Sequence, residues 1–279
     1  MATAVTTPAQ PLHGRSPLVL WHLLSLDAPC VAALWTGFLA HQLEVRQSAA
    51  VPFALGLAVW MLYAADRIHD GMRGSAMEER HHFHLRHRFS FAAGAAGAAF
   101  LLFLLLFALP GHLRMAWFLL APPLAIYLAS VHLLRLPHLP KEPLVAVFFS
   151  LAVCMPLVVS RGVTREPLIL VLAAFGGLCW LNCIAIARWE QALTTTDSYT
   201  AWLGRHFPAG VCFTLLLILP LLHAATRGIA MAVAMGAGCL FLLDRMRHRL
   251  DRTQLRALAD AAMLSPLVVW LVPALFKGR

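Results

Sequence analysis

Long apolar runs separated by short polar connections make up almost the whole chain. A helix needs about 20 apolar residues to cross the hydrocarbon core of a bilayer, and runs of that length predict nine membrane spans. The predicted spans cover residues 17–40, 50–70, 90–109, 114–134, 142–160, 167–190, 206–225, 228–244 and 255–276. We therefore expect an all-α fold, one polytopic bundle of nine transmembrane helices over residues 17–279, preceded by a polar, disordered tail over residues 1–16.

The composition also indicates a membrane protein. Of the 279 residues, 60% are hydrophobic and 13% are charged, whereas soluble globular chains average about 45–50% apolar and about 25% charged residues. So few charges cannot cover the surface of a soluble fold, and so many apolar residues exclude a disordered chain. The formal net charge of +9 fits basic loops that contact anionic membrane lipids, and we expect no nucleic-acid partner.

The distribution of lysine and arginine predicts the orientation of the bundle. Cytoplasmic loops of membrane proteins are enriched in these residues. With the N-terminus in the cytoplasm, fifteen of the 22 lysines and arginines fall on the inner side of the membrane. An odd number of spans then places the C-terminus outside.

Two acidic residues mark the inner end of the second predicted span. Asp66 and Asp70 are four residues apart, so on a helix their carboxylates share one face, about 6 Å apart along the axis. Adjacent carboxylates repel each other unless a cation lies between them. Oxygen ligands in this arrangement suit Mg²⁺, which completes its shell with water and phosphate oxygens. The spacing alone leaves a second interpretation open, a solvated helix end with an Asp–Arg pair.

The sixth predicted span ends in a similar way. Asn182 and Glu190 are eight residues apart, on roughly the same face of a helix. An asparagine is costly in lipid, so Asn182 is expected to face the bundle interior, where an interhelical hydrogen bond is its simplest role. Glu190 falls at the cytoplasmic mouth, at the depth of Asp66 and Asp70. It either contributes to a site there or pairs with Arg188 at the level of the headgroups.

Two further aspartates lie deep inside apolar runs. Asp27 belongs to the first predicted span and Asp260 to the last one. Neither carboxylate can face lipid cheaply, so each must point into the bundle or pair with a cation. A structural partner, for example an arginine or His22, and a role in a site are both open.

The connection after the second span contains a basic, histidine-rich segment over residues 78–88. A histidine cluster can bind a transition metal, as in membrane di-iron oxygenases, but those proteins use more histidines in several groups. We expect an amphipathic interfacial helix that covers the site or binds phosphate.

Together these motifs resemble the UbiA superfamily of intramembrane polyprenyl transferases. Proteins of that superfamily have nine transmembrane helices around a central cavity, with an Asn-x3-Asp-x3-Asp motif at the inner end of helix 2. Asp66 and Asp70 match the last two positions of that motif, and Leu62 stands in place of the asparagine. Tyr127 ahead of Lys141 looks like the Tyr and basic pair that lies near the diphosphate in the family. The resemblance covers residues 17–276 and is to a divergent bacterial branch, which implies the bacterial inner membrane.

The second aspartate motif of the superfamily, Asp-x3-Asp at the inner end of helix 6, is incomplete in this chain. Counting back from Glu190 gives Ile186 where the first aspartate is expected, and Asp197 follows seven residues after Glu190. This departure leaves two interpretations open. One is a Mg²⁺-assisted prenyltransferase that acts on an isoprenoid diphosphate and a lipophilic acceptor. The other is a non-catalytic UbiA-like membrane protein that binds a lipid or isoprenoid, or serves as a partner subunit.

The resemblance also implies roles for individual residues. The expected catalytic metal ligands are Asp66, Asp70 and Glu190. The expected substrate contacts are Arg67, Tyr127, Lys141, Asn182 and Arg188. In the enzyme interpretation, Mg²⁺ and basic side chains stabilise the negative charge that develops on the leaving diphosphate.

Overall fold

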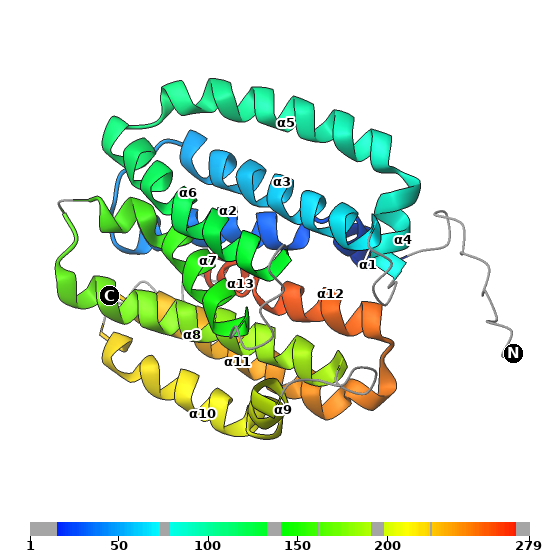
Figure 1. Cartoon of the computed structure of the whole chain (residues 1–279). Helices are drawn as coiled ribbons and strands as arrows, with labels where there is room; N and C mark the ends of the chain where they lie inside the picture. Colours follow the sequence, from blue (N-terminus) through cyan, green and yellow to red (C-terminus); the bar gives the residue numbers. More distant parts are fainter. Residues whose placement is uncertain are drawn as a thin grey trace, which may run out of the picture.

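The computed structural model describes residues 16–72, 79–132, 141–160, 162–190, 198–223 and 225–271, and within these ranges all regular secondary structure is helical (Figure 1). In chain order the elements are α1 (Pro17–Leu23), α2 (Asp27–Gln42), α3 (Ala50–Met72), α4 (Glu79–Arg86), α5 (Arg88–Ala108), α6 (Gly111–His132), α7 (Lys141–Val158), α8 (Arg165–Glu190), α9 (Ser198–Arg205), α10 (Phe207–Leu217), η2 (Leu219–Leu221), α11 (Arg227–Met246), η3 (Arg247–Arg249), α12 (Arg252–Ala262) and α13 (Pro266–Leu271). The expectation of an all-α fold is confirmed.

Helix α8 is the longest helix and lies among α7, α10, α11 and α12 (Figure 1). Its close packing depends on small residues. A Cβ atom at Gly236 of α11 would lie 3.1 Å from both methyl carbons of Leu178 on α8 and 3.4 Å from the carbonyl oxygen of Ala262 on α12. Small residues at helix contacts let the backbones approach closely, which is how helices gain packing energy in a membrane.

The outer helices expose apolar side chains rather than polar ones. Phe100, Phe103 and Phe107 of α5 are 65%, 56% and 69% exposed. A helix with such a surface would be unfavourable in water, but hydrocarbon solvates it at no cost. The described part of the chain contains six helices long and apolar enough to cross a membrane, or seven if α1 and α2 form one broken span. These helices are those of an integral membrane protein.

The prediction of nine spans is not confirmed, because three predicted spans are broken, short or only partly described. Helices α1 and α2 meet at an angle of 91°. The apolar helix over Phe207–Leu221 is shorter than the six long ones. The last predicted span divides into α12 and α13 around Leu264, just before Pro266, and its remainder lies beyond the described residues. A hydropathy window cannot detect such breaks, since it sums over residues without recording the direction of the backbone.

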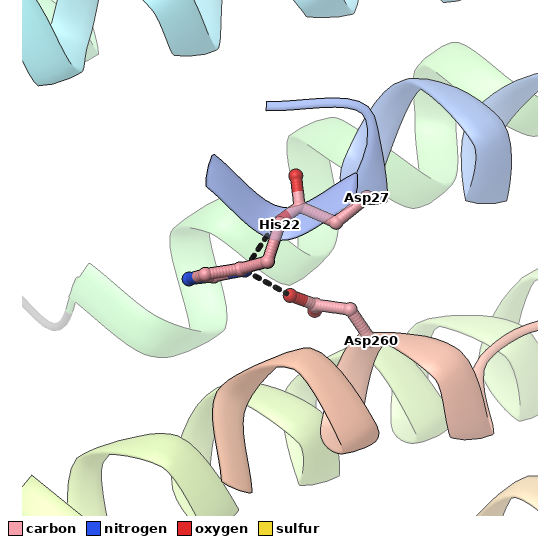
Figure 2. Close-up of side chains that lie close together, drawn as sticks. All are labelled: His22, Asp27 and Asp260. Atoms are coloured by element: carbon pink, nitrogen blue, oxygen red, sulfur yellow. Dashed lines mark ion pairs between the residues drawn. The ribbon is translucent and has the colours of Figure 1, made fainter. Parts of the chain in front are cut away.

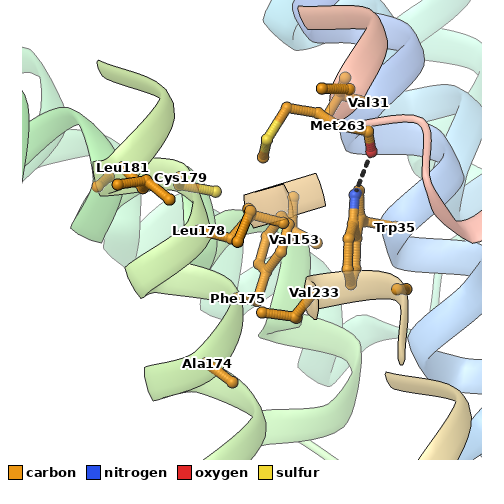
Figure 3. Close-up of a cluster of buried hydrophobic side chains, with 14 of the residues drawn as sticks. Val31, Trp35, Val153, Ala174, Phe175, Leu178, Cys179, Leu181, Val233 and Met263 are labelled. Atoms are coloured by element: carbon orange, nitrogen blue, oxygen red, sulfur yellow. Dashed lines mark hydrogen bonds between the residues drawn. The ribbon is translucent and has the colours of Figure 1, made fainter. Parts of the chain in front are cut away.

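The centre of the bundle is an apolar core in which Trp35 of α2 is fully buried. Its ring lies against Phe175 of α8, with the ring centroids 4.5 Å apart. Its indole N–H donates a hydrogen bond of 2.7 Å to the carbonyl oxygen of Met263, where α12 ends (Figure 3). The break between α12 and α13 leaves carbonyl groups without helical partners, and Trp35 satisfies one of them.

We predict that Trp35→Phe destabilises the bundle, because the carbonyl of Met263 loses its donor inside the apolar core. The free energy of unfolding is expected to fall by about 1–3 kcal/mol. The measurement is the unfolding temperature of the purified protein in detergent, which should be lower in the variant. Trp202→Phe is the control, since Trp202 is half-exposed. Equal unfolding temperatures of the two variants would contradict this role of Trp35.

Candidate functional site

A buried arginine holds the break between α1 and α2 together. Arg67 of α3 is 3% exposed. Its guanidinium donates to the carbonyl oxygen of His22 at 2.6 Å, to Oγ of Ser25 at 2.8 Å and to Oδ2 of Asp27 at 3.0 Å. These acceptors lie near the end of α1, in the break and at the start of α2. Ser25 has a φ of 58°, a left-handed conformation that few residues other than glycine adopt, so the arginine stabilises a strained turn.

The break between α1 and α2 is also contacted by a side chain from α4. His84 of α4 is fully buried, and its Nε2 atom lies at hydrogen-bond distance, 2.9 Å, from Oγ of Ser25. The ring of His84 also stacks on Phe91 of α5, with the centroids 4.0 Å apart. The sequence predicted a helix over the histidine-rich segment, and α4 confirms this for Glu79–Arg86. At least one of its histidines packs inside the bundle rather than facing the interface.

Figure 2 shows one imidazole ring between two carboxylates from distant parts of the chain. Nδ1 of His22 lies 2.6 Å from Oδ2 of Asp27 and 3.7 Å from Oδ2 of Asp260. The shorter contact is an ion pair by distance, although its direction is not that of a hydrogen bond. Of the options left open for Asp27, the structure shows burial together with a cationic partner, since both Arg67 and His22 contact it.

His22, Asp27 and Asp260 are also close enough to be ligands of a metal ion, because their nearest ligand atoms lie within 4.8 Å of one another. The guanidinium of Arg67 already contacts Asp27, however, and it would repel a divalent cation at this point. With His22 protonated, two cations face two carboxylates and the buried charges balance without a metal. We therefore interpret this group as an ion-pair network that joins α1, α2, α3 and α12.

A small cavity of about 50 Å³ adjoins this network. Its walls are mostly apolar, and the residues that line it are Ala28, Val31, Tyr63, Val145, Ala146, Phe149, Cys179, Asn182, Cys183, Asp260 and Met263. Nδ2 of Asn182 donates to Oδ1 of Asp260 at 3.2 Å, which confirms the expected interhelical hydrogen bond between α8 and α12. The Oδ1 atom of Asn182 is buried without a hydrogen-bond partner among the described residues, and this leaves an acceptor beside the cavity.

Asp66 and Asp70 lie in the last turns of α3, one and two turns beyond Tyr63 of the cavity wall. Both residues are half-buried and make contacts of their own. Two carboxylates one turn apart on a helix are a donor set that fits Mg²⁺ together with water and phosphate oxygens. The described part of the chain does not bring Glu190 within ligand distance of this pair.

Glu190 and Arg188 are ion-paired to helices other than α3. The guanidinium of Arg256 on α12 contacts the carboxylate of Glu190. Arg188 donates from Nε to Oδ1 of Asp244 on α11 at 2.9 Å, and it also contacts the carbonyl oxygen of Gly204. Glu190 thus has Arg256, not Arg188, as its described partner. The metal-ligand role of Glu190 and the diphosphate role of Arg188 stay predictions.

Tyr127 contacts the backbone of Lys141 rather than its ammonium group, so the diphosphate role of these two residues stays a prediction. The hydroxyl group of Tyr127 on α6 donates to the carbonyl oxygen of Lys141 at 3.4 Å, a long contact that ties α6 to the start of α7. The side chain of Lys141 is exposed. Two further predictions, those on Asp197 and on the polar tail up to residue 15, fall outside the described residues.

The sequence analysis did not identify several residues whose side chains connect the helices described above. Ser25, Asp244 and Arg256 carry no motif, and each is identified only by its partner on another helix. One signal was available for Asp244, a carboxylate at the end of an apolar run with an arginine three residues later. Arg247 does contact it, at 2.8 Å.

Comparison of the chain with protein-family models, with curated proteins and with solved structures gave no match.

We predict that Arg67→Lys lowers the stability of the protein, because a lysine has no planar fork and cannot reach three acceptors at once. Each charge-assisted hydrogen bond that is not replaced costs about 1.5–3 kcal/mol, which corresponds to a fall of roughly 5 °C or more in the unfolding temperature. Arg86→Lys on α4 is the matched control, since Arg86 is exposed. If both variants unfold at the temperature of the native protein, the arginine does not hold the break.

Proposed function

We propose that this protein transfers a prenyl group from an isoprenoid diphosphate to a lipophilic acceptor inside the membrane, in the manner of the UbiA superfamily. The observation that supports this most directly is the position of Asp66 and Asp70. Their carboxylates follow Tyr63 by one and two turns of α3, and Tyr63 lines a cavity with mainly apolar walls. A diphosphate bound at the two aspartates would leave its apolar end toward that cavity.

The roles follow from these positions. Asp66 and Asp70 would hold Mg²⁺, which when bound supplies charge neutralisation for the leaving diphosphate. Lys141 begins α7 with an exposed ammonium group, and the contact with Tyr127 fixes the backbone at this point. The apolar walls of the cavity exclude water from the reacting end of the chain. Arg67 would contribute to substrate binding only indirectly, because its described contacts position α1 and α2 beside the cavity.

The proposed arrangement in the membrane follows the same resemblance. The nine predicted spans would form if α1 with α2, and α12 with α13 and the residues after it, each cross the bilayer as one broken span, and if the helix over Phe207–Leu221 crosses as well. The end at which α3 and α8 finish would face the cytoplasm of a bacterial inner membrane, with the N-terminus inside and the C-terminus outside.

A second candidate function is binding of an isoprenoid or lipid without catalysis, by this protein alone or as a subunit of a complex. The observation that favours it is the ion pair between Glu190 and Arg256. A carboxylate in that pair is not available to hold a second metal ion from the α8 side.

We predict that the purified protein releases diphosphate from farnesyl or geranylgeranyl diphosphate when Mg²⁺ is present, and that Asp70→Asn reduces the rate at least about tenfold. The amide keeps the size of the side chain but removes one of two negative charges that hold the ion. Glu166→Gln is the control, because Glu166 is exposed in the first turn of α8. The measurement is the initial rate of diphosphate release by anion chromatography.

The same experiment separates the two candidate functions. Mg²⁺-dependent binding of a prenyl diphosphate that is lost in Asp70→Asn, without any release of diphosphate, would favour the non-catalytic function. Release that is equal in the native protein and in Asp70→Asn would contradict the proposed role of the α3 aspartates.

A further inference from the structure

A second and larger cavity lies where α8, α11 and α12 meet. Its volume is about 460 Å³. It is lined by Arg188 and Trp189 of α8, Arg247 and His248 of η3, and Arg252 of α12, together with two leucines. No residue of α3 lines it, so it is separate from Asp66 and Asp70. We call it the basic cavity.

The basic cavity has an excess of positive charge that no described residue neutralises. Its lining contains three arginines and no acidic residue. Arg188 and Arg247 share a single carboxylate oxygen, Oδ1 of Asp244, at 2.9 Å and 2.8 Å. Arg252 makes no ion pair with any described residue. Three guanidinium groups therefore face one carboxylate, and an anion in the cavity would restore the balance.

Two of the three arginines, Arg188 and Arg247, are also held in place before any ligand binds. Oδ1 of Asp244 accepts from Arg188, from Arg247 and, at 3.1 Å, from the indole N–H of Trp189. NH1 of Arg188 contacts the carbonyl oxygen of Gly204 as well. Side chains fixed in this way lose little conformational entropy on binding, which favours recognition of an anion. The planar guanidinium group matches the geometry of a phosphate, to which it can donate two parallel hydrogen bonds.

The position of the basic cavity indicates which molecule would supply a phosphate group to it. Figure 1 shows that the long apolar helices α8 and α11 end on the same side of the bundle. The residues that line the cavity lie at or just after these ends. In a membrane-spanning bundle this is the depth of the lipid headgroups, and basic pockets between transmembrane helices bind anionic headgroups. The exposed side chains of Leu242 and Met246 on the last turns of α11 provide an apolar surface for acyl chains at the same end.

We propose that the basic cavity binds a phosphate group, supplied by the headgroup of an anionic phospholipid. This proposal does not rest on the proposed function, since it involves neither the α3 aspartates nor a prenyl diphosphate. A bound lipid would bridge α8, α11 and α12 from outside. Lipid binding would therefore strengthen the end of the bundle that Asp244 and Glu190 join through their ion pairs.

The test is native mass spectrometry of the full-length protein with phosphatidylglycerol or phosphatidylcholine added. We expect the native protein to prefer phosphatidylglycerol, and Arg252→Gln to weaken that binding about fivefold. Arg252→Lys keeps the charge and should retain most of the affinity. Arg245→Gln is the matched control, because it removes the same charge from an exposed residue that does not line the cavity.

Inorganic phosphate distinguishes the two sources of the ligand. If millimolar phosphate displaces phosphatidylglycerol from the native protein, the cavity recognises a phosphate group from either source. If phosphate has no effect while Arg252→Gln still weakens lipid binding, the cavity is specific for the lipid headgroup. The proposal is overturned if Arg252→Gln and Arg245→Gln bind phosphatidylglycerol equally, or if phosphatidylcholine binds as well as phosphatidylglycerol does.

Discussion

The guanidinium group of Arg67 is the interaction on which the arrangement of the N-terminal helices depends. A helix that bends by 91° inside an apolar bundle interrupts the regular hydrogen bonds of its backbone, and neither hydrocarbon nor an apolar core can replace them. Arg67 donates to the carbonyl of His22 and to Ser25, and its charge is matched by Asp27. Burying one arginine is unfavourable by itself. Here its cost is offset by three acceptors at the break between α1 and α2.

The polar network that begins at Arg67 continues through ion pairs and a hydrogen bond to α12 and α8. Asp27 contacts His22, His22 contacts Asp260, and Asp260 accepts from Asn182. Helices α1, α2, α3, α12 and α8 are therefore held by one chain of polar contacts beside the small cavity. Such a chain fixes the relative positions of helices whose apolar surfaces alone would permit sliding. Any chemistry at Asp66 and Asp70 takes place on a helix that this network anchors.

The residues at the end of α8 show how neighbouring positions acquire different roles. Arg188 and Glu190 are two residues apart, yet one is paired with α11 and the other with α12. The two pairs connect three helices where they leave the apolar region, and they leave the guanidinium groups of the basic cavity in excess. Structural ion pairs and a ligand-binding surface can thus share the same short segment, because successive side chains on a helix point about 100° apart.

The sequence by itself determined that the chain is a membrane-embedded helical protein, since length and hydropathy decide whether a helix can lie in lipid. It also determined that Asp27 and Asp260 either point into the bundle or pair with a cation, and that Asn182 faces the bundle interior, because an unpaired polar group in hydrocarbon is costly whatever the fold. Only the tertiary structure decided that Arg67 points to Asp27, 40 residues away, and that Glu190 pairs with Arg256, 66 residues away. The breaks in the first and last predicted spans were decided there too. Hydropathy records how apolar a segment is, whereas partners and bends depend on which helices become neighbours.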